Sequence, residues 1–374
     1  MTERFIGLMS GTSLDGVDGV LADFSDGRIS VRGHATAPFS MALRTELLAL
    51  NDPDGTNELH RAALAGSALA RVYAEVTREL LARADVAPDS VTAIGVHGQT
   101  VRHRPGEFDE TGYTLQINNP ALLAELSGID VVAEFRTRDV AAGGQGAPLV
   151  PAFHRALFAH DDEAVAVLNL GGISNLSLLP PRRSDPQNIL GFDCGPGNAL
   201  MDHWAQSHLG EPYDAGGAWA ASGRVLPDLL ARLAGDPYFS KPPPKSTGRD
   251  LFNPTWLAAH LNEAAQAATA DVQATLAELT ASACAAGVVR YGMNSKTLVV
   301  CGGGALNAHL MTRLGALLPG LTVVSSADRG LPPQQVEAAA FAWLARATVR
   351  REHGNLASVT GAKGGRVLGA IYPA

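Results

Sequence analysis

The sequence predicts an α/β fold of two lobes, on the basis of three observations. The 374 residues suffice for two or three domains, and the 46% apolar content suffices for packed cores. Apolar, strand-like runs alternate with long helical segments. Both halves begin with an apolar strand, a glycine-containing turn and a second apolar strand. We therefore assign residues 1–135 and about 350–374 to an N-terminal lobe, and residues 136–349 to a C-terminal lobe.

The N-terminal lobe opens with a hairpin pattern, because apolar residues 4–9 and 17–24 flank the turn-rich stretch 10–16. Residues 58–84 predict a long helix, since their apolar side chains recur at spacings of three and four. The other expected elements of this lobe are the strands 28–35, 91–97 and 129–134 and the short helix 121–127.

The C-terminal lobe repeats the opening pattern after a hinge at 141–146: strand 165–170, the turn Gly171-Gly172 and strand 176–179. Its further expected elements are the helices 198–209, 218–233, 271–291, 306–317 and 333–348 and the strand 297–301. Short apolar runs in the tail, 361–371, are expected to return to the first lobe.

Composition and charge argue against several classes of protein. The net charge is −8 and no basic tract is present, whereas nucleic-acid binding needs clustered Lys and Arg. The three cysteines form neither a disulfide framework nor a zinc spacing, which favours a reducing compartment. No signal peptide opens the chain, and no uninterrupted apolar run reaches the ~18 residues of a membrane helix. We expect a cytoplasmic protein without a membrane or nucleic-acid partner.

The turn between the first two strands is the first candidate site for an anion. It comprises Gly11, Thr12, Ser13, Leu14, Asp15, Gly16, Val17 and Asp18. Successive amides in such a turn form an anion cradle, and the two carboxylates are suited to holding Mg²⁺ through water. An ordinary hairpin turn is the alternative, since Asp-Gly is a common turn dipeptide. The sequence lacks the GxxxxGK[ST] pattern of a P-loop.

Two glycine motifs of the second lobe are further candidates. The turn with Gly171, Gly172, Ser174 and Asn175 is suited to holding phosphate, although alone it favours a plain glycine turn. The strand end with Gly302, Gly303, Gly304 and Asn307 would let a ring or a phosphate lie against the backbone. The alternative for these three glycines is close packing of a strand on a helix.

Asp193 is the candidate general base, in the sequence Gly-Phe-Asp-Cys-Gly-Pro-Gly-Asn at 191–198. It ends an apolar strand and precedes a helix, where a carboxylate can accept a proton from an attacking group. In phosphoryl transfer the protein mainly positions reactants and neutralises charge. Helix capping is the alternative, and it fits poorly because Asp193 lies several residues before the expected helix.

The remaining candidates suit a hydroxyl-rich, anionic ligand. The hydrogen-bonding residues His97, Gln99 and Thr100 follow a buried strand, although a lone His is more often structural. Arg136 and Arg138 suit bidentate binding of a carboxylate, but at least one of them can be a solvated surface residue. Glu337 begins an apolar helix, where it either binds sugar hydroxyls or favours the helix N-terminus.

Eight motifs in this order resemble the anhydro-N-acetylmuramic acid kinase family, from about Phe5 to Tyr372. They are GLMSGTSLDGVD, HGQTVRHRP, EFRTRDVAAGGQGAPLVP, LNLGGISNLSLL, GFDCGPGN, PPKSTGRDLFN, CGGGALNAHLM and VEAAAFAWLA. The resemblance implies two actin-like (ribonuclease H-like) lobes with an ATP and sugar cleft between them. It also implies ATP phosphates at both turns, adenosine near 302–304, Asp193 as the catalytic base, and the sugar at or near His97, Gln99, Thr100, Arg136 and Glu337.

The reaction implied by the resemblance opens the 1,6-anhydro ring of 1,6-anhydro-N-acetylmuramic acid with water and phosphorylates O6. The products are N-acetylmuramic acid 6-phosphate and ADP, with Mg²⁺ held mainly by the ATP phosphates. A homodimer is also implied. Two residues depart from the family pattern: Asn118 stands where Gly is expected, and Cys194 where Thr is expected. Because Cys194 follows the base, it could alter the hydrogen bonding of Asp193.

Three other functions compete with this reading. A related kinase could act on another anhydrosugar such as levoglucosan, and pairing of Arg136 or Arg138 with the lactyl carboxylate would separate the two. A non-catalytic sugar sensor on the same fold is expected to carry a DNA-binding appendage, whereas this chain enters its first strand by Phe5. An ATPase chaperone would need a peptide-binding domain.

Overall fold

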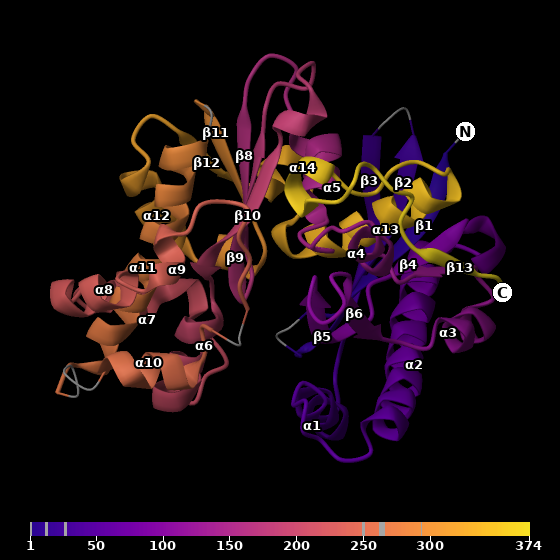
Figure 1. Cartoon of the computed structure of the whole chain (residues 1–374), viewed down its shortest axis with the longest axis horizontal. Coiled ribbons are helices and arrows are strands. Elements are labelled where there is room, and N and C mark those ends of the chain that lie inside the picture. Colours follow the sequence, from indigo (N-terminus) through magenta and orange to yellow (C-terminus); the bar gives the residue numbers. More distant parts are fainter. Residues whose placement is uncertain (1, 12–13, 26–27, 249–250, 262–265, 293) are drawn as a thin grey trace. The chain divides into compact units, whose positions relative to one another are not determined.

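The structure, a computed structural model, describes residues 2–11, 14–25, 28–248, 251–261, 266–292 and 294–374 (Figure 1). The chain forms two compact units, one of Met1–Leu157 with Gln335–Ala374 and one of Phe158–Gln334. They are unit 1 and unit 2 below. These bounds differ from those of the expected lobes, because residues 136–157 and 335–349 join the N-terminal part of the chain.

Helix α13 (Val336–Val349) accounts for much of this difference, because it packs directly on the sheet of unit 1. A Cβ atom on Gly7 would collide with the carbonyl oxygen of Ala338, and one on Gly95 would collide with that of Phe341. Glycine in the strands therefore permits a very close approach of the helix. The alanine-rich sequence of α13 belongs to the core of unit 1.

The sheet of unit 1 has the order β13-β7-β4-β1-β2-β3. Strands β1, β2 and β3 form an antiparallel meander, β4 and β7 run parallel to β1, and the edge strand β13 is antiparallel to β7. The strands are β1 (Glu3–Met9), β2 (Gly16–Ser25), β3 (Arg28–Pro38), β4 (Ala93–Val96), β7 (Val131–Ala133) and β13 (Ala370–Tyr372). Strand β13 pairs with β7, so the expected return of the C-terminal tail to this unit is confirmed.

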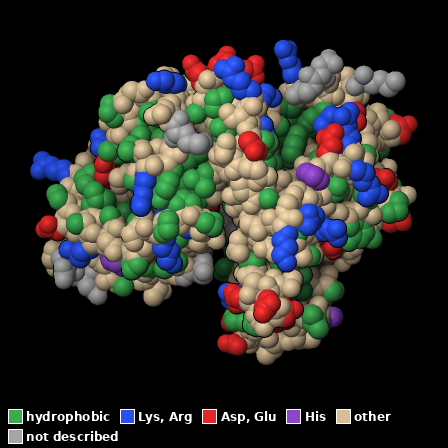
Figure 2. Space-filling view, turned by 45° about the horizontal axis from the view of Figure 1, so that its top comes forward, with side chains coloured by type: hydrophobic (Ala, Val, Ile, Leu, Met, Phe, Trp, Pro, Cys, Tyr) green, Lys and Arg blue, Asp and Glu red, His purple; other side chains and the backbone are tan. Residues whose placement is uncertain are grey.

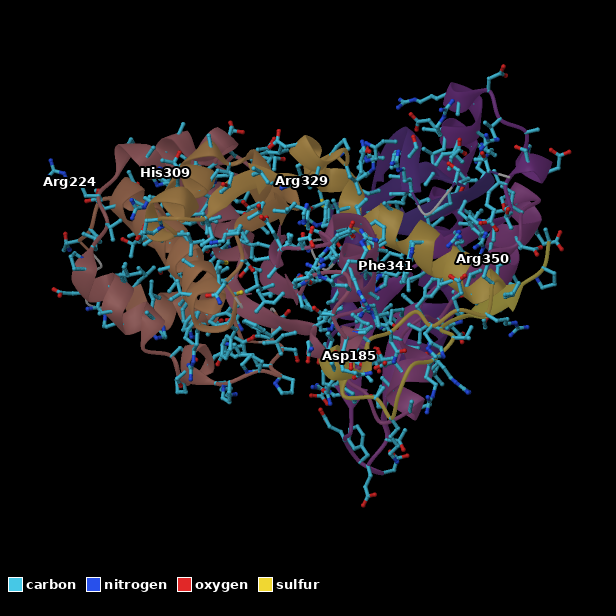
Figure 3. The ribbon with its side chains drawn as sticks, turned by 90° about the horizontal axis from the view of Figure 1, so that it is seen from above. Asp185, Arg224, His309, Arg329, Phe341 and Arg350 are labelled. Carbon is cyan, nitrogen blue, oxygen red and sulfur yellow. The ribbon has the colours of Figure 1, made fainter. Side chains whose placement is uncertain are left out.

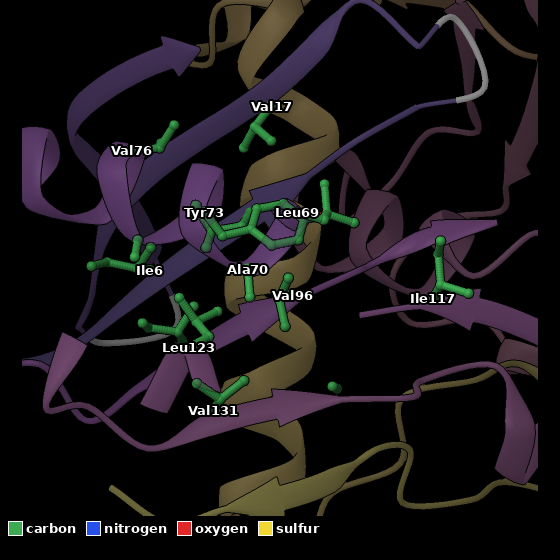
Figure 4. Packing of buried hydrophobic residues seen from close by; sticks show 14 of the residues in the cluster. Ile6, Val17, Leu69, Ala70, Tyr73, Val76, Val96, Ile117, Leu123 and Val131 are labelled. Carbon is green, nitrogen blue, oxygen red and sulfur yellow. The ribbon is translucent and has the colours of Figure 1, made fainter. Parts of the chain in front are cut away.

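Helix α2 (Glu58–Ala84) covers the face of this sheet opposite α13. Figure 4 shows Leu69 and Tyr73 of α2 among Ile6, Val17 and Val96 of the strands. Successive side chains of a strand point to opposite faces of the sheet, so β1 contacts both helices. Ile6 packs against α2, whereas Phe5 belongs to the cluster that includes α13. The other elements of unit 1 are α1 (Met41–Ala49), β5 (Gln99–Pro105), β6 (Gly112–Ile117), α3 (Pro120–Ser127), α4 (Thr137–Ala141), α14 (Ala357–Thr360) and most of α5 (Val150–Phe158).

The sheet of unit 2 has the order β10-β9-β8-β11-β12. The strands are β8 (Val165–Leu170), β9 (Ile173–Leu179), β10 (Leu190–Pro196), β11 (Thr297–Cys301) and β12 (Thr322–Ser325). Here too an antiparallel meander is followed by strands parallel to its first member. The order β3-β2-β1-β4-β7 of unit 1 therefore matches the order of unit 2, with β13 as an additional strand. The predicted α/β fold of two similar lobes is confirmed.

Helix α11 (Thr269–Tyr291) is the core helix of unit 2. By length and mean hydropathy, 1.3 in its most apolar window, it could cross a membrane, but 78% of that window is buried inside the protein. Glu278 within it forms an ion pair with Arg313, with an Nε–Oε2 distance of 2.7 Å. Its apolar composition thus reflects packing among α6 (Ala199–Leu209), α7 (Ala218–Ser222), α8 (Pro227–Ala234) and α12 (Ala308–Leu317).

One expected helix, 218–233, is divided in the structure. Helix α7 ends at Ser222, Gly223 is extended with φ −89° and ψ 176°, and α8 begins at Pro227. A Cβ on Gly223 would collide with the carbonyl oxygen of Ala270, so this glycine is required by the packing of the chain on itself. Proline at the first helical position then starts the second helix. The short helices α9 (Pro237–Ser240) and α10 (Pro254–Leu261) follow.

Charged side chains of both signs are interspersed over the face that Figure 2 shows. On this face the described Lys and Arg side chains lie among Asp and Glu rather than forming one continuous basic surface. This distribution agrees with the net charge of −8.

Candidate functional site

His97 is the centre of a polar cluster in unit 1, at the carboxyl end of β4. Its Nδ1 donates to the carbonyl oxygen of Ser10 at 3.3 Å, and its Nε2 accepts from Arg136 Nε at 3.1 Å and Nη2 at 3.0 Å. Burial and, after it, the charge of Arg136 lower the pKa of His97 to about 3. His97 is therefore a neutral imidazole whose tautomer is fixed by both neighbours.

Arg136 is oriented by a second, buried set of contacts. Its Nη1 donates to the carbonyl oxygen of Gly146 at 2.8 Å. Gly146 is fixed in turn by Asp139, whose Oδ2 accepts from the Gly146 amide at 2.8 Å and whose Oδ1 accepts from the Thr360 hydroxyl at 2.8 Å. Arg138, on the exposed side of α4, lies outside this cluster. Of the two candidate arginines, the structure thus brings only Arg136 to His97.

Glu337 lies in the first turn of α13 and is half-buried. Phe341, labelled on this helix in Figure 3, follows four residues later and lies on the same helix face. The Phe341 ring is 4.9 Å from the ring of His97. Glu337 therefore lies one helical turn from the residue that supports His97, within the same unit.

Gln99 and Thr100 differ in how their polar atoms are satisfied. Gln99 is 1% exposed, and its Nε2 donates to the carbonyl oxygen of Gly11 at 3.2 Å. Its Oε1 is buried and has no hydrogen-bond partner among the described residues. Thr100 is half-buried on β5, and its hydroxyl accepts from Gln116 Nε2 at 3.2 Å. The unpaired oxygen of Gln99 is the better candidate for a ligand hydroxyl, because an unsatisfied buried acceptor costs about 1–3 kcal/mol.

The turn between β1 and β2 is described only in part, because Thr12 and Ser13 lie outside the described residues. Leu14 has φ 59° and its amide donates to Gly11 at 3.2 Å, so the chain reverses tightly here. The side chains of Leu14 and Val17 are buried in the core and can offer a ligand only their backbone. Gly16 is packed against the backbone of Ala37.

Asp15 and Asp18 fit a water-mediated magnesium site better than a direct one. The Asp15 side chain is 74% exposed and lies 3.8 Å from Arg44, and that of Asp18 is 48% exposed and lies 3.3 Å from His34. Within the described ranges, no group of three His, Cys, Asp or Glu side chains could enclose a metal ion. Magnesium usually keeps several waters and is held largely by phosphates, so two exposed carboxylates are compatible with it.

The Gly171-Gly172 turn of unit 2 is tied to the strand end that follows Asp193. The amides of Gly197 and Asn198 donate to the carbonyl oxygens of Gly172 and Gly171 at 2.9 and 2.8 Å. A Cβ on Gly171 would meet nothing closer than 3.6 Å, so this turn is open enough for a ligand to approach. Ser174 is different, because its buried hydroxyl donates to the carbonyl oxygen of Gly195 at 3.1 Å and has a structural role.

The three glycines after β11 have different surroundings. Gly302 has φ 79°, and a Cβ there would collide with Asn169 Oδ1 and with the carbonyl oxygen of Leu170. Gly304 packs against Leu170 as well. A Cβ on Gly303 would meet only Asn198 Nδ2, at 3.6 Å. Close packing therefore explains two of the glycines, and Gly303 alone leaves room for a ligand.

Asn307 has a clear structural role as the N-cap of α12. Its Oδ1 accepts from the amide of Leu310 at 3.0 Å. A side-chain cap of this kind satisfies one of the free amides of the first helical turn. The expected helix at 306–317 accordingly begins at Ala308.

Asp193 lies near the end of β10, half-buried and held by an irregular strap at 240–248. Its amide donates to the carbonyl oxygen of Lys245 at 3.1 Å, and its Oδ2 accepts from the amide of Thr247 at 2.9 Å. Its own carbonyl oxygen accepts from the Tyr238 hydroxyl at 2.8 Å. The strap fixes both the backbone and the carboxylate of Asp193, which suits a group that must point at one reacting atom.

Sequence reasoning missed Lys245, Thr247 and Tyr238 as neighbours of Asp193. Lys245 Nζ lies 4.6 Å from the centre of the Tyr238 ring and donates to the Tyr238 carbonyl oxygen at 3.3 Å, and burial lowers the pKa of Lys245. The signal available was Lys, Ser and Thr within the motif PPKSTGRDLFN, in a segment otherwise rich in Pro. Arg249 and Asp250 of this motif lie outside the described residues.

A row of polar side chains crosses unit 2 in register. Cys301 on β11 pairs with Asn169 on β8, Asn169 with Asn175 on β9, and Asn175 with Asp193 on β10. Directly opposed residues in neighbouring strands project to the same face, so these side chains are neighbours. The pattern connects the Gly302 strand end to Asp193 through two asparagines.

Cys194, which follows Asp193, belongs to the core instead. It is 3% exposed, and a hydrogen bond with Cys284 of α11, together with burial, raises the pKa of its thiol. Cys194 therefore remains a neutral thiol paired with another thiol. No described hydrogen bond joins its side chain to the Asp193 carboxylate, although the sequence allowed for an influence on the base.

Comparison with known proteins assigns a family to this arrangement. The family model described as anhydro-N-acetylmuramic acid kinase matches residues 3–374. The chain belongs to the anhydro-N-acetylmuramic acid kinase family. It is 73% identical over 373 residues to the anhydro-N-acetylmuramic acid kinase of Variovorax paradoxus (strain S110), covering 100% of this chain and 99% of that one.

Two further similarities complete the comparison. The anhydro-N-acetylmuramic acid kinase of Albidiferax ferrireducens is 63% identical over 390 residues and matches both chains along 100% of their length. Among solved structures, the ROK hexokinase from Thermus thermophilus is similar with a TM-score of 0.38 and 16% identity, over 92% of this chain and 100% of that one.

Most of the candidate residues fall into one group within each unit. The candidate residues of this group in unit 1 are His97, Gln99, Arg136 and Glu337. Those in unit 2 are the Gly171-Gly172 turn, Asp193 and Gly303. Arg138, Ser174 and Asn307 have surroundings that suit exposed or structural roles.

Proposed function

We propose that this chain is an ATP-dependent kinase that opens the 1,6-anhydro ring of 1,6-anhydro-N-acetylmuramic acid and phosphorylates O6. The products are N-acetylmuramic acid 6-phosphate and ADP, and the reaction serves the recycling of peptidoglycan. We infer the substrate from the family match, which covers residues 3–374. The structural support is Asp193, whose carboxylate is held by the Thr247 amide next to the Gly171-Gly172 turn.

In the proposed reaction Asp193 acts as the general base. The carboxylate takes a proton from a water molecule, whose oxygen forms a bond to C1 while the C1–O6 bond breaks. The electron pair released on O6 attacks the γ-phosphorus, and the bond from that phosphorus to the oxygen of ADP breaks. Transfer of the phosphoryl group thus replaces the protonation that an acid supplies in glycosidases.

The unit 1 cluster is proposed to recognise the sugar. Arg136 is held in one orientation by His97 and Gly146, and a guanidinium fixed in this way suits the lactyl carboxylate. Gln99 offers a buried amide oxygen to a sugar hydroxyl. Glu337 is proposed to accept from a further hydroxyl. Thr100 and Arg138 are assigned weaker contributions, since Thr100 is engaged by Gln116 and Arg138 is exposed.

ATP is proposed to bind through backbone atoms of the two glycine turns and of Gly303. Magnesium, when bound, neutralises phosphate charge, and Asp15 and Asp18 can reach it through water. In our proposal the side chains of Ser174 and Asn307 contribute only by shaping the backbone. Cytoplasmic location and a homodimer complete the proposed description.

One experiment tests the proposed function. The protein is incubated with Mg-ATP and 1,6-anhydro-N-acetylmuramic acid, and the product is identified by mass. Gain of both a water and a phosphoryl group is expected. Gain of a phosphoryl group alone would contradict ring opening. Faster turnover of levoglucosan, which lacks the lactyl carboxylate, would contradict the substrate.

A further inference from the structure

Two buried polar atoms beside Asp193 lack hydrogen-bond partners among the described residues. They are the side-chain oxygen Oδ1 of Asn175 and the hydroxyl Oγ1 of Thr247. Leaving such an atom unpaired costs about 1–3 kcal/mol, so an unpaired buried group in a native protein points to a water or a ligand. Neither atom takes part in the proposed contacts to ATP or to the sugar.

Both atoms belong to residues in direct contact with Asp193. Asn175 is the cross-strand partner of Asp193, so their side chains lie on the same face of the sheet with Cβ atoms about 5 Å apart. Thr247 donates its amide to Asp193 Oδ2 at 2.9 Å, and its hydroxyl is attached only three covalent bonds from that nitrogen. The two unpaired oxygens thus belong to two neighbours of Asp193, one on β9 and one on the strap.

We propose that Asn175 and Thr247 hold the attacking water on the carboxylate of Asp193. This inference depends on the proposed function. A water molecule has two protons and two lone pairs. One proton goes to Asp193, the second is donated to Asn175 Oδ1, and one lone pair accepts from the Thr247 hydroxyl. The remaining lone pair forms the bond to C1, while the C1–O6 bonding pair leaves with O6.

This arrangement gives Asn175 a role different from the phosphate contact expected from the sequence. Its unpaired atom is an acceptor oxygen, which would repel phosphate oxygens but matches the second proton of a water molecule. Asn175 thereby becomes a specificity residue for water. A small alcohol has only one proton, so it cannot satisfy both Asp193 and Asn175.

The test measures the partition between water and methanol as nucleophiles. Methanolysis gives the methyl glycoside 6-phosphate, which mass spectrometry separates from the hydrolysis product. Asn175→Leu retains the size of the side chain and offers an apolar surface to a methyl group. We expect its ratio of methanolysis to hydrolysis to rise about tenfold, since a lost acceptor is worth about 1–3 kcal/mol.

Thr247 provides a matched pair of variants. Thr247→Val removes the hydroxyl but keeps the amide that binds Asp193, and Thr247→Ser keeps both. We expect kcat to fall about 30-fold in Thr247→Val and less than about threefold in Thr247→Ser, with the KM for ATP and the acid limb of the pH profile unchanged.

Three outcomes would overturn the proposal: an unchanged product ratio in Asn175→Leu, equal loss of kcat in both Thr247 variants, or full activity in Thr247→Val. Failure of the proposed function is seen separately, because the wild-type protein would then not turn over the anhydrosugar or Asp193→Asn would remain active. Thermal unfolding of each variant shows whether it is folded, and the product ratio is independent of the amount of active protein.

Discussion

Units 1 and 2 share the order of five strands but use equivalent strand ends in opposite ways. The strand beside the first strand of the meander is β4 in unit 1 and β11 in unit 2, and each is parallel to that first strand. After β4 come His97 and Gln99, separated by Gly98; both side chains are buried and make hydrogen bonds to the backbone. After β11 come three glycines, of which two are packed and one is open.

We propose that this difference reflects two kinds of recognition on one scaffold. Unit 1 presents side chains of fixed orientation, which suit a sugar with many hydroxyls and one carboxylate. Unit 2 presents backbone at its glycine turns, which suits the phosphates of a nucleotide. The proposed base, Asp193, lies on β10, the third strand of the second meander. The corresponding strand of unit 1, β3, carries no residue that we assign to the reaction.

The sharpest test of the comparison is the base itself. Asp193→Asn should lower kcat by about 10³-fold or more, because the amide cannot accept the proton, while the affinity for ATP stays within about twofold. Steady-state kinetics and calorimetric titration with ATP measure the two effects. Activity near that of the wild type would remove Asp193 from the reaction.

The glycines of unit 2 provide the next largest effect. Gly302→Ala should lower the free energy of unfolding by about 2–3 kcal/mol, because φ is 79° and the new Cβ collides with Asn169. Gly303→Ala should leave stability within about 0.5 kcal/mol but raise the KM for ATP several-fold. Urea unfolding and kinetics of both variants decide this. Equal destabilisation would contradict the distinction between packed and open glycines.

The arginines of unit 1 test recognition by side chains. Arg136→Lys should raise the KM for the anhydrosugar by about 10–50-fold, since lysine cannot reproduce the forked contacts to His97 and Gly146. Arg138→Lys, on the exposed side of α4, is the matched control and should change KM by less than about twofold. A larger effect at Arg138 than at Arg136 would reverse our assignment.

The smallest expected effect concerns pH. The pKa of His97 is about 3 in the folded protein, below its ordinary value of 6.5, so acid favours the unfolded chain, which binds the proton first. The contribution of His97 to the free energy of unfolding is therefore complete above about pH 6.5 and declines as the pH falls toward 3. Between about pH 7 and pH 6 the loss is about 0.7 kcal/mol.

Comparison with a variant isolates this contribution. Urea unfolding at the two pH values should show a smaller decrease in His97→Gln than in the wild type. Burial also lowers the pKa of His154 to about 3, so a residual decrease is expected in the variant. Equal decreases in both proteins would show that His97 does not titrate as described.

The sequence predicted the elements that follow simple periodic rules and the motifs at their ends. The opening strands, α2 and α11 were expected from their spacing of apolar residues, and the glycine turns and Asp193 from their motifs. The assignment of α13 to unit 1 could not be predicted. This helix is alanine-rich and buried on most sides, so its sequence has no amphipathic pattern that indicates which sheet it packs against.

Long-range contacts were also out of reach of sequence reasoning. Thr247 meets Asp193 across 54 positions of the chain, from a strap without periodicity. Arg136 and Arg138 are equivalent in sequence, and only the short helix α4 turns one toward His97 and the other outward. The roles of Gly302 and Gly303 likewise depend on Asn169, which is distant along the chain.

The division of the chain has a consequence for its synthesis. Unit 2 is one continuous stretch, 158–334, and can fold as soon as that stretch has left the ribosome. Unit 1 must wait for α13 and for Thr360, which holds the loop behind Arg136 through Asp139, and for β13 at the end of the sheet. Nascent chains are therefore expected to fold unit 2 first and to complete unit 1 only after residues 335–372 have left the ribosome.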